Sequence, residues 1–233
     1  MGSRNSPVPV QVGSGIPTKI RDYVYCLPFN DFDAVEQCLN DHHGEIAALL
    51  VEPCLGNIVG IEPKDGFLQH LRNLCDKYNV VLIFDEVKTG FRLSNGGARE
   101  TYEVIPDIST YAKSLGNGVP VAAFGGKSEV MNVIGGGSVA HAGTFGGNGV
   151  SMSAANAVLD ILNEAPVLKE LSIRGQKLKK GMDNILDEVG IPHQMCGHPN
   201  IQGFLITEHK VEEVRDLAYS DDAMYEKIMD HMF

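Results

Sequence analysis

The sequence is short of positive charge. Its 233 residues include 19 lysines and arginines against 30 aspartates and glutamates, which gives a formal net charge of −11. A chain this acidic would be repelled by nucleic acid and by anionic membranes, so we expect neither as a partner. A small-molecule substrate is the better expectation.

Paired cysteines and paired clusters of metal ligands are also lacking. The five cysteines form an odd number without short paired spacings, so neither a disulfide framework nor a zinc site is predicted. The pattern His193-x-x-Cys196-x-His198 has no second cluster to complete it, and we expect no bound metal. Unpaired cysteines favour a reducing compartment, and we expect a cytoplasmic protein.

Residues 1–17 have no continuous apolar core, which argues against a signal peptide or a membrane span in that stretch. They are rich in Gly, Ser, Pro and Val and are predicted to form a loop. The whole chain is 43 % hydrophobic, which is enough to bury a sizeable core.

The most informative stretch is an apolar, β-branched run, Val80 to Phe84, that ends in the carboxylates Asp85 and Glu86. Five apolar residues in a row predict a buried strand, central in a parallel sheet that is covered on both sides. Ligands of such sheets bind beyond the carboxyl ends of the strands. A carboxylate buried there is costly unless a cation or a hydrogen-bond donor meets it, so this strand end is the predicted site.

Two chemistries use an acidic strand end of this kind. A magnesium-dependent nucleotidase also requires the loop Gly-x-x-x-x-Gly-Lys-Ser/Thr. The nearest match, Gly126-Lys127-Ser128, has Val121 where the first Gly belongs and follows the acidic strand instead of preceding it. The second chemistry pairs the carboxylate with the protonated ring nitrogen of pyridoxal phosphate, and it also requires a lysine.

Lys113 is the candidate lysine. It follows the apolar segment Ile108 to Ala112 and precedes Gly116 and Gly118. A lysine that forms a Schiff base needs backbone that the cofactor can approach closely, and it needs partial desolvation so that its amine can attack. A lysine in a Gly-rich loop is otherwise a solvated turn residue, so the prediction depends on Asp85.

In order and with family-like spacing, the motifs of this chain resemble the class III pyridoxal-phosphate aminotransferases, including the glutamate-1-semialdehyde aminomutases. The resemblance runs from about Gly15 to the C-terminus and covers about half of the family's pattern. The matching motifs are Leu82-Ile83-Phe84-Asp85-Glu86-Val87, Thr89-Gly90-Phe91-Arg92, Pro106-Asp107, Ala112-Lys113-Ser114 and Gly143-Thr144-Phe145.

The resemblance implies a role for several residues. Lys113 would carry the Schiff base and then the proton, Asp85 would hold the ring nitrogen, and Val87 would pack on the ring. Thr144 would bind the cofactor phosphate of a neighbouring subunit, which implies a homodimer with shared active sites. Glu52, at the end of a strand, and Asn57, in the turn that follows, are candidates for contacting substrate or cofactor.

Some residues depart from the family's pattern. Lys88 stands where related enzymes commonly place Gln or Met, so we expect its amine to point away from the cofactor. Asn57 and the stretch Thr89 to Arg92 favour the aminomutases within the family. Asn117-Gly118 and Phe145 to Gly147 differ from the residues that aminomutases usually have at these positions.

The hydrophobic pattern predicts an α/β fold. Strand 46–51, helix 66–78 and the strand from Val80 form a parallel βαβ unit. The resemblance implies a three-layer sheet with helices on both faces in residues 1–165, a cofactor-binding large domain that is incomplete at its N-terminus. Residues 166–233 would form a linking helix and part of a smaller α+β domain. Further helices are predicted over 31–39, 127–134, 151–162 and 167–189, and strands over 121–124 and 201–206.

We therefore predict a pyridoxal-phosphate-dependent class III aminotransferase that moves an amino group between an amine or amino acid and an oxo compound. A glutamate-1-semialdehyde 2,1-aminomutase and a catalytically incompetent fragment are the alternatives. The resemblance assigns the phosphate cup and a ring-stacking aromatic to a segment that this sequence does not contain. We therefore expect the 233 residues alone not to turn over substrate.

Overall fold

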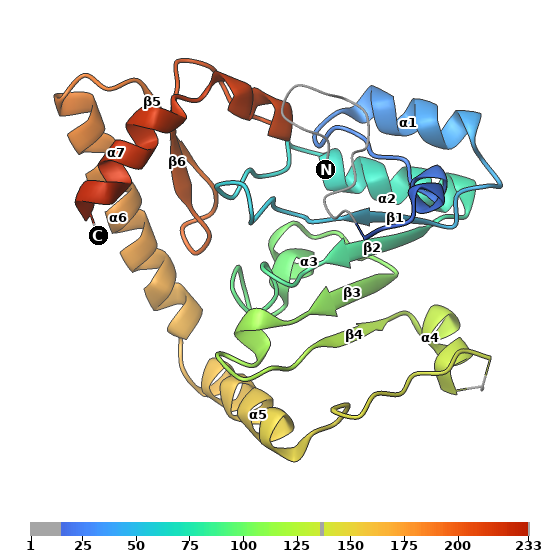
Figure 1. Ribbon diagram of the computed structural model, residues 1–233. Helices are drawn as coiled ribbons and strands as arrows, with labels where there is room; N and C mark the ends of the chain where they lie inside the picture. The colour runs from blue at the N-terminus through green and yellow to red at the C-terminus, as the bar shows by residue number, and fades with distance from the viewer. Residues whose placement is uncertain (1–14, 136–137, 233) are drawn as a thin grey trace.

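A computed structural model describes residues 15–135 and 138–232 of the chain. Two sheets organise it, one of four strands and one of two (Figure 1). The strands are β1 Ala48–Val51, β2 Val81–Asp85, β3 Ile108–Tyr111, β4 Ala123–Gly126, β5 His193–Cys196 and β6 Gly203–Ile206. The α-helices are α1 Phe32–Asp41, α2 Phe67–Tyr78, α3 Gly97–Thr101, α4 Ser128–Gly135, α5 Gly149–Glu164, α6 Val167–Glu188 and α7 Asp222–Met232. The 3-10 helices are η1 Thr18–Tyr23, η2 Lys113–Leu115 and η3 Val214–Tyr219.

The larger sheet has the strand order β1-β2-β3-β4. β1, β2 and β3 are parallel, and β4 runs antiparallel to β3. Helix α2 connects β1 to β2, packs on β2 and is covered in turn by α1. The predicted α/β class and the parallel βαβ unit are both confirmed.

Helices α1 and α2 begin and end where local chemistry dictates. The Asp31 carboxylate, at the start of the helix predicted over 31–39, caps α1 by accepting a hydrogen bond from Ala34 N at 3.0 Å. Helix α2 ends at Asn79, whose left-handed φ of 55° stops the helix. The apolar face of α2 supplies much of the main core, with Phe67, Leu68, Leu71, Leu74 and Cys75 all buried.

The two faces of the larger sheet are covered unequally within the described chain. Leu82 and Phe84 on β2 are fully buried under α2, whereas Ile83, which points to the opposite face, is only half-buried. Leu50 is paired with Ile83 across the β1–β2 ladder and is 66 % exposed. Full burial on both faces of this strand, as the apolar run predicted, is therefore not reached among the described residues.

Strand boundaries differ from the sequence prediction by one to two residues for physical reasons. β2 begins at Val81, because the N–H of Val80 bonds to Cys75 O and belongs to the end of α2. β4 is displaced from the predicted 121–124 to Ala123–Gly126, because its ladder to β3 pairs Gly126 with Ile108. Such offsets arise from pairing partners that the local sequence does not contain.

The two-stranded sheet has a small core of its own. β5 and β6 are antiparallel, and Leu186 from α6 packs with Phe204 and Ile206 from β6. Helix α6 runs from the end of α5 up to this sheet, and α7 lies against β6 (Figure 1). None of the described helices is both long enough and apolar enough to cross a membrane.

Asp107, just before β3, joins several elements of the larger sheet. Its carboxylate accepts hydrogen bonds from Arg72 Nη1 at 2.8 Å and from Leu82 N at 2.7 Å, and it pairs with Lys127 Nζ at 2.7 Å. Burial alone would raise the pKa of Asp107, but the contacts from Lys127, Leu82 and Arg72 outweigh it and lower that pKa. Arg72 also pairs with Asp76, which is exposed.

Replacing Asp107 should destabilise the fold strongly. Asp107→Asn should lower the free energy of unfolding by about 3 kcal/mol, because it removes the charge that compensates the buried Arg72 guanidinium. The matched change Asp76→Asn should cost less than about 1 kcal/mol, because that carboxylate is largely solvated. Urea unfolding of both variants measures the difference, and equal losses would contradict this account.

The same interaction sets a pH dependence. Because the folded-state pKa of Asp107 is lowered, its stabilising contribution is present above the ordinary value of 3.8 and is lost as the pH falls through the folded value. The unchanged protein should therefore lose stability in acid more steeply than Asp107→Asn does.

Candidate active site

Parallel pairing brings the predicted site residues to one edge of the larger sheet. Val51 pairs with Phe84, so the next residues along the two strands, Glu52 and Asp85, lie at the same edge. Asp85 in turn pairs with Thr110 on β3, and Lys113 begins η2 directly beyond that strand. The carboxyl ends of β1, β2 and β3 therefore each contribute to the candidate site.

Asp85 is held by one carboxylate oxygen and leaves the other available. Its Oδ1 accepts hydrogen bonds from Val87 N at 3.0 Å and from Thr110 Oγ1 at 3.3 Å. Among the described residues, Oδ2 has no hydrogen-bond partner. The side chain is half-buried, so this oxygen can accept from a cationic group of a ligand. Thr110 was not predicted from the sequence, because only the strand register places it beside Asp85.

Glu52 lies in the same electrostatic environment. Its Oε2 accepts a hydrogen bond from Gly56 N at 3.2 Å. Burial raises the pKa of Glu52, and repulsion from Asp85 raises it further, against smaller opposing effects from Gly56 N–H, Lys88 and Asn57. Glu52 therefore holds a proton more readily than an exposed glutamate.

Lys88, the departure from the family pattern, reaches the turn that carries Asn57. Its Nζ donates to Gly56 O at 2.8 Å. Burial lowers the pKa of Lys88, and the neighbouring Lys113 lowers it further, while Glu52 opposes the shift. Lys88 thus ties the Gly56 turn to the end of β2, on the same side as Lys113.

Lys113 occupies an unusual backbone position. Its φ of 46° lies in the left-handed region, which non-glycine residues rarely adopt. The residue is exposed, so the partial desolvation that the sequence predicted is not provided by the described part of the chain. Val87, the predicted ring-packing residue, is half-buried at the end of β2.

Thr144 stands apart from this group. It lies in the segment between α4 and α5 and is exposed. Among the described residues it makes no hydrogen bond, and none links it to Asp85 or Lys113. The role predicted for it, at the site of a neighbouring subunit, does not require such a contact within one chain.

Glu86 faces the interior although it is adjacent to Asp85, because successive side chains at the end of β2 point to opposite faces. It is 0 % exposed, and its Oε2 accepts hydrogen bonds from Ala98 N at 2.6 Å and from Thr89 Oγ1 at 3.3 Å. Burial raises the pKa of Glu86 against these hydrogen bonds. Glu86 ties the end of β2 to α3 and leaves Asp85 as the carboxylate of this strand that the site can use.

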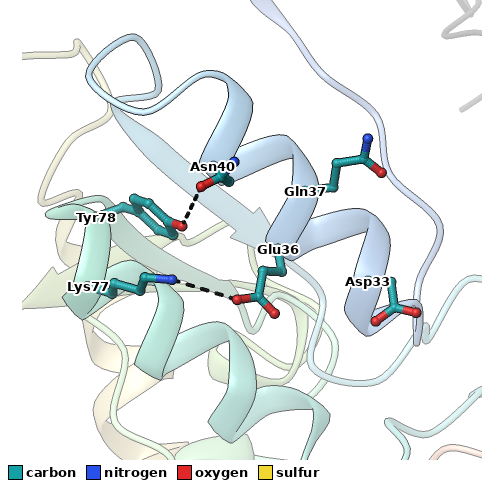
Figure 2. A pocket seen from close by; sticks show the side chains of 6 residues that line it. All are labelled: Asp33, Glu36, Gln37, Asn40, Lys77 and Tyr78. Atoms are coloured by element: carbon teal, nitrogen blue, oxygen red, sulfur yellow. Dashed lines mark hydrogen bonds and ion pairs between the residues drawn. The ribbon is translucent and has the colours of Figure 1, made fainter.

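Two hollows of the described surface contain none of the predicted site residues. One, of about 300 Å³, lies between α1 and α2 (Figure 2). Four of its lining residues pair with one another, with Lys77 Nζ at 3.7 Å from Glu36 Oε1 and Tyr78 Oη donating to Asn40 Oδ1 at 3.3 Å. The candidate site is instead the open edge of the parallel strands.

Comparison with known proteins decides the family. The family model for class III aminotransferases matches residues 22–226, which is most of the chain. This chain belongs to the class III aminotransferase family. Enzymes of the family depend on pyridoxal phosphate, so the resemblance seen in the sequence motifs and the cofactor expected from it are both confirmed at this level.

Individual relatives agree with the family and divide over the reaction. A glutamate-1-semialdehyde 2,1-aminomutase from Aquifex aeolicus is 39 % identical over 91 % of this chain and 50 % of its own length. The crystal structure of an omega-transaminase from Sphaerobacter thermophilus has a TM-score of 0.84 at 34 % identity, with 92 % of this chain and 50 % of that one covered. A beta-phenylalanine aminotransferase from Variovorax paradoxus has a TM-score of 0.79 at 31 % identity, with 86 % and 47 % covered. The chain spans about half the length of the relatives it matches.

Gly97 lies against the buried Glu86 carboxylate, so a larger residue at this position should destabilise the fold. This glycine has a φ of 68°, and a Cβ built on it would overlap Glu86 Oε2. Gly97→Ala should lower the free energy of unfolding by about 3 kcal/mol, from backbone strain and displacement of the carboxylate together.

Gly66→Ala is the matched control, because Gly66 has a similar φ of 78° and nothing within 4 Å of a new Cβ. It should cost only about 1 kcal/mol, from backbone strain alone. Chemical denaturation measures both values, and equal losses would show that the Glu86 contact contributes nothing.

Proposed function

We propose that this chain contributes the lysine-bearing part of a pyridoxal-phosphate-dependent aminotransferase, which moves an amino group between an amine or amino acid and an oxo compound. The observation that carries the proposal is the placement of Asp85 and Lys113 at the carboxyl ends of adjacent parallel strands, in a chain of the class III family. The activity, substrates and partners are proposed for the whole protein of which such a chain forms part.

The residues present fit the cofactor. Asp85 offers an Oδ2 that no described residue binds, at the ligand-binding edge of the sheet, which suits a protonated ring nitrogen. When bound, pyridoxal phosphate supplies an electron-withdrawing ring that stabilises negative charge at the carbon next to the amino group. Lys113 would hold the cofactor covalently through Nζ and then carry the proton that the reaction moves.

The remaining predicted site residues would orient and enclose the cofactor and substrate. Val87 would pack on one face of the ring, and Thr144 would bind the phosphate of a second copy of the protein, so the proposed assembly is a homodimer with shared sites. Glu52, directly after β1, and Asn57, in the turn that follows, would contact substrate or cofactor near Asp85. We further propose that the large domain ends at residue 165, that α6 links it to the smaller domain, and that the protein is cytoplasmic.

Covalent attachment at Lys113 tests the proposal directly. The chain should be mixed with excess pyridoxal phosphate, reduced with borohydride and mapped by peptide mass. The pyridoxyl mass should appear on the peptide that contains Lys113, because this lysine follows β3, the strand that pairs with the end of β2 at Asp85.

Lys88→Arg and Lys127→Arg are the controls, because both keep Lys113 and each removes another lysine, one that binds the Gly56 turn and one that pairs with Asp107 at the start of β3. Each should retain the label, and Lys113→Arg should lose it. Labelling confined to Lys88 or Lys127, or absent from the chain, would contradict the assignment.

A second candidate function is the aminomutase reaction, which the similarity to the Aquifex aeolicus enzyme favours. A longer protein carrying this chain would distinguish the two. The aminotransferase proposal expects amino transfer between two different molecules, whereas an aminomutase should convert glutamate-1-semialdehyde without a second oxo compound.

The remaining alternative is that the chain is a catalytically incompetent fragment of such an enzyme. The 233 residues alone are expected to show neither activity, because positioning the cofactor requires both its ring and its phosphate to be held.

A further inference from the structure

We propose that Arg92 is a positioning residue for Lys113 and that it acts through the hydroxyl of Ser114. The inference rests on the function proposed for Lys113, but its structural basis stands independently of that function. The segment containing Arg92 contacts the lysine-bearing turn on both sides.

The backbone of Lys113 needs outside support. Its left-handed φ of 46° carries a strain of about 1 kcal/mol or more for a non-glycine residue. The turn is closed by hydrogen bonds from Gly116 N at 3.1 Å and from Asn117 N at 2.9 Å to Lys113 O. The residue at the start of this 3-10 helix, Ala112, has no side-chain group that could cap it. Such a turn keeps one conformation only if surrounding groups fix it.

Arg92 supplies one of these fixing contacts. Its Nε and Nη2 both donate to Ser114 Oγ, at 3.2 and 2.9 Å. Two donors from one rigid, planar guanidinium restrict the hydroxyl more than a single flexible donor would. Among the described residues Arg92 forms no ion pair, so its charged group is not committed elsewhere.

The preceding residue supports the other side of the turn. The Phe91 ring lies 5.4 Å from the ring of Tyr111, two positions before Lys113. Gly90 allows this approach, because a Cβ at that position would collide with the Tyr111 ring. Phe91 and Arg92 therefore contact residues on either side of Lys113.

The backbone of Arg92 is itself anchored from the C-terminal part of the chain. Asn200, in the loop before β6, donates through Nδ2 to Arg92 O at 2.8 Å and to Leu168 O at 3.4 Å. This contact joins α6 and the β5–β6 loop to the segment after β2. The Arg92 carbonyl is thus fixed by Asn200, while the Arg92 guanidinium binds Ser114. A residue fixed at its backbone and at its side chain can hold the adjacent Lys113 turn in one position.

The turn hydrogen bonds offer a readout that needs no cofactor. In the 233-residue chain, amide hydrogen exchange at Leu115, Gly116 and Asn117 reports opening of the turn. Arg92→Met and Ser114→Ala should each raise these exchange rates about tenfold, because each removes the same pair of hydrogen bonds. Ser114→Thr keeps the hydroxyl and should restore the slow rates.

The double variant Arg92→Met with Ser114→Ala decides whether the two residues act together. Its exchange rates should rise no further than those of either single variant. Arg174→Met is the control, because Arg174 is an exposed arginine paired with Glu170 on α6, and it should leave the three amides unchanged. Unchanged rates in the single variants, or fully additive effects in the double variant, would overturn the proposal. Should Arg92→Met fail to fold, Ser114→Ala compared with Ser114→Thr decides the question.

Pyridoxyl labelling separates this inference from the proposed function. The initial rate of labelling at Lys113 should fall in Ser114→Ala and recover in Ser114→Thr, while the labelled position stays the same. If Lys113 is not labelled even in the unchanged chain, the proposed function fails, and the exchange rates still decide whether Arg92 positions the turn.

Discussion

The parallel pairing of β1, β2 and β3 is the constraint on which the candidate site depends. Parallel strands place their carboxyl ends at one edge, so the residues that follow them meet in space although they are far apart in sequence. Glu52, Asp85 and Lys113 are brought together in this way. The antiparallel β4 does not extend this edge, and the candidate site is confined to the three parallel strands.

Because side chains alternate at the end of β2, the adjacent carboxylates Asp85 and Glu86 lie on opposite faces, and only Asp85 is available to the candidate site. Glu86 points inward, is fully buried and holds α3 and Thr89, whereas one Asp85 oxygen has no partner in the part of the chain that the structure describes. The strand register determines this arrangement, because a shift of one residue would move Asp85 to the buried face and Glu86 to the open face. The pairing of Asp85 with Thr110 shows that the register fixes the face on which Asp85 lies.

The segment that follows β2 connects the site to the rest of the molecule. Lys88 holds the Gly56 turn, Glu86 holds α3, and Arg92 lies between Ser114 and Asn200. Contacts made by the seven residues from Glu86 to Arg92 therefore reach the turn after β1, α3, η2 and the loop between β5 and β6. A change in this segment would be expected to alter the geometry of Lys113 without touching it directly.

Much of the fold follows from local pattern. The apolar run before Asp85 predicted β2 to within one residue, and the helices predicted over 31–39 and 66–78 correspond to α1 and α2. The elements that pack on each face of the sheet were less predictable. An apolar run such as Val81 to Phe84 indicates that both faces of the strand are apolar, but it does not identify the elements that cover them. Leu50, which pairs with Ile83, is apolar and yet largely exposed in the described chain.

The motifs around Asp85 and Lys113 indicate the family that the comparison shows, because the chemistry demands a carboxylate and a lysine. The contacts that orient them depend on residues with no distinguishing local signal. Thr110 reaches Asp85 through strand register, Ser114 meets Arg92 across 22 positions, and Asn200 meets Arg92 across 108. The sequence by itself determined which groups can act and which strands carry them. Only the tertiary structure decided which face each carboxylate takes and what holds Lys113, because hydrogen bonds between distant segments form only once the sheet has been assembled.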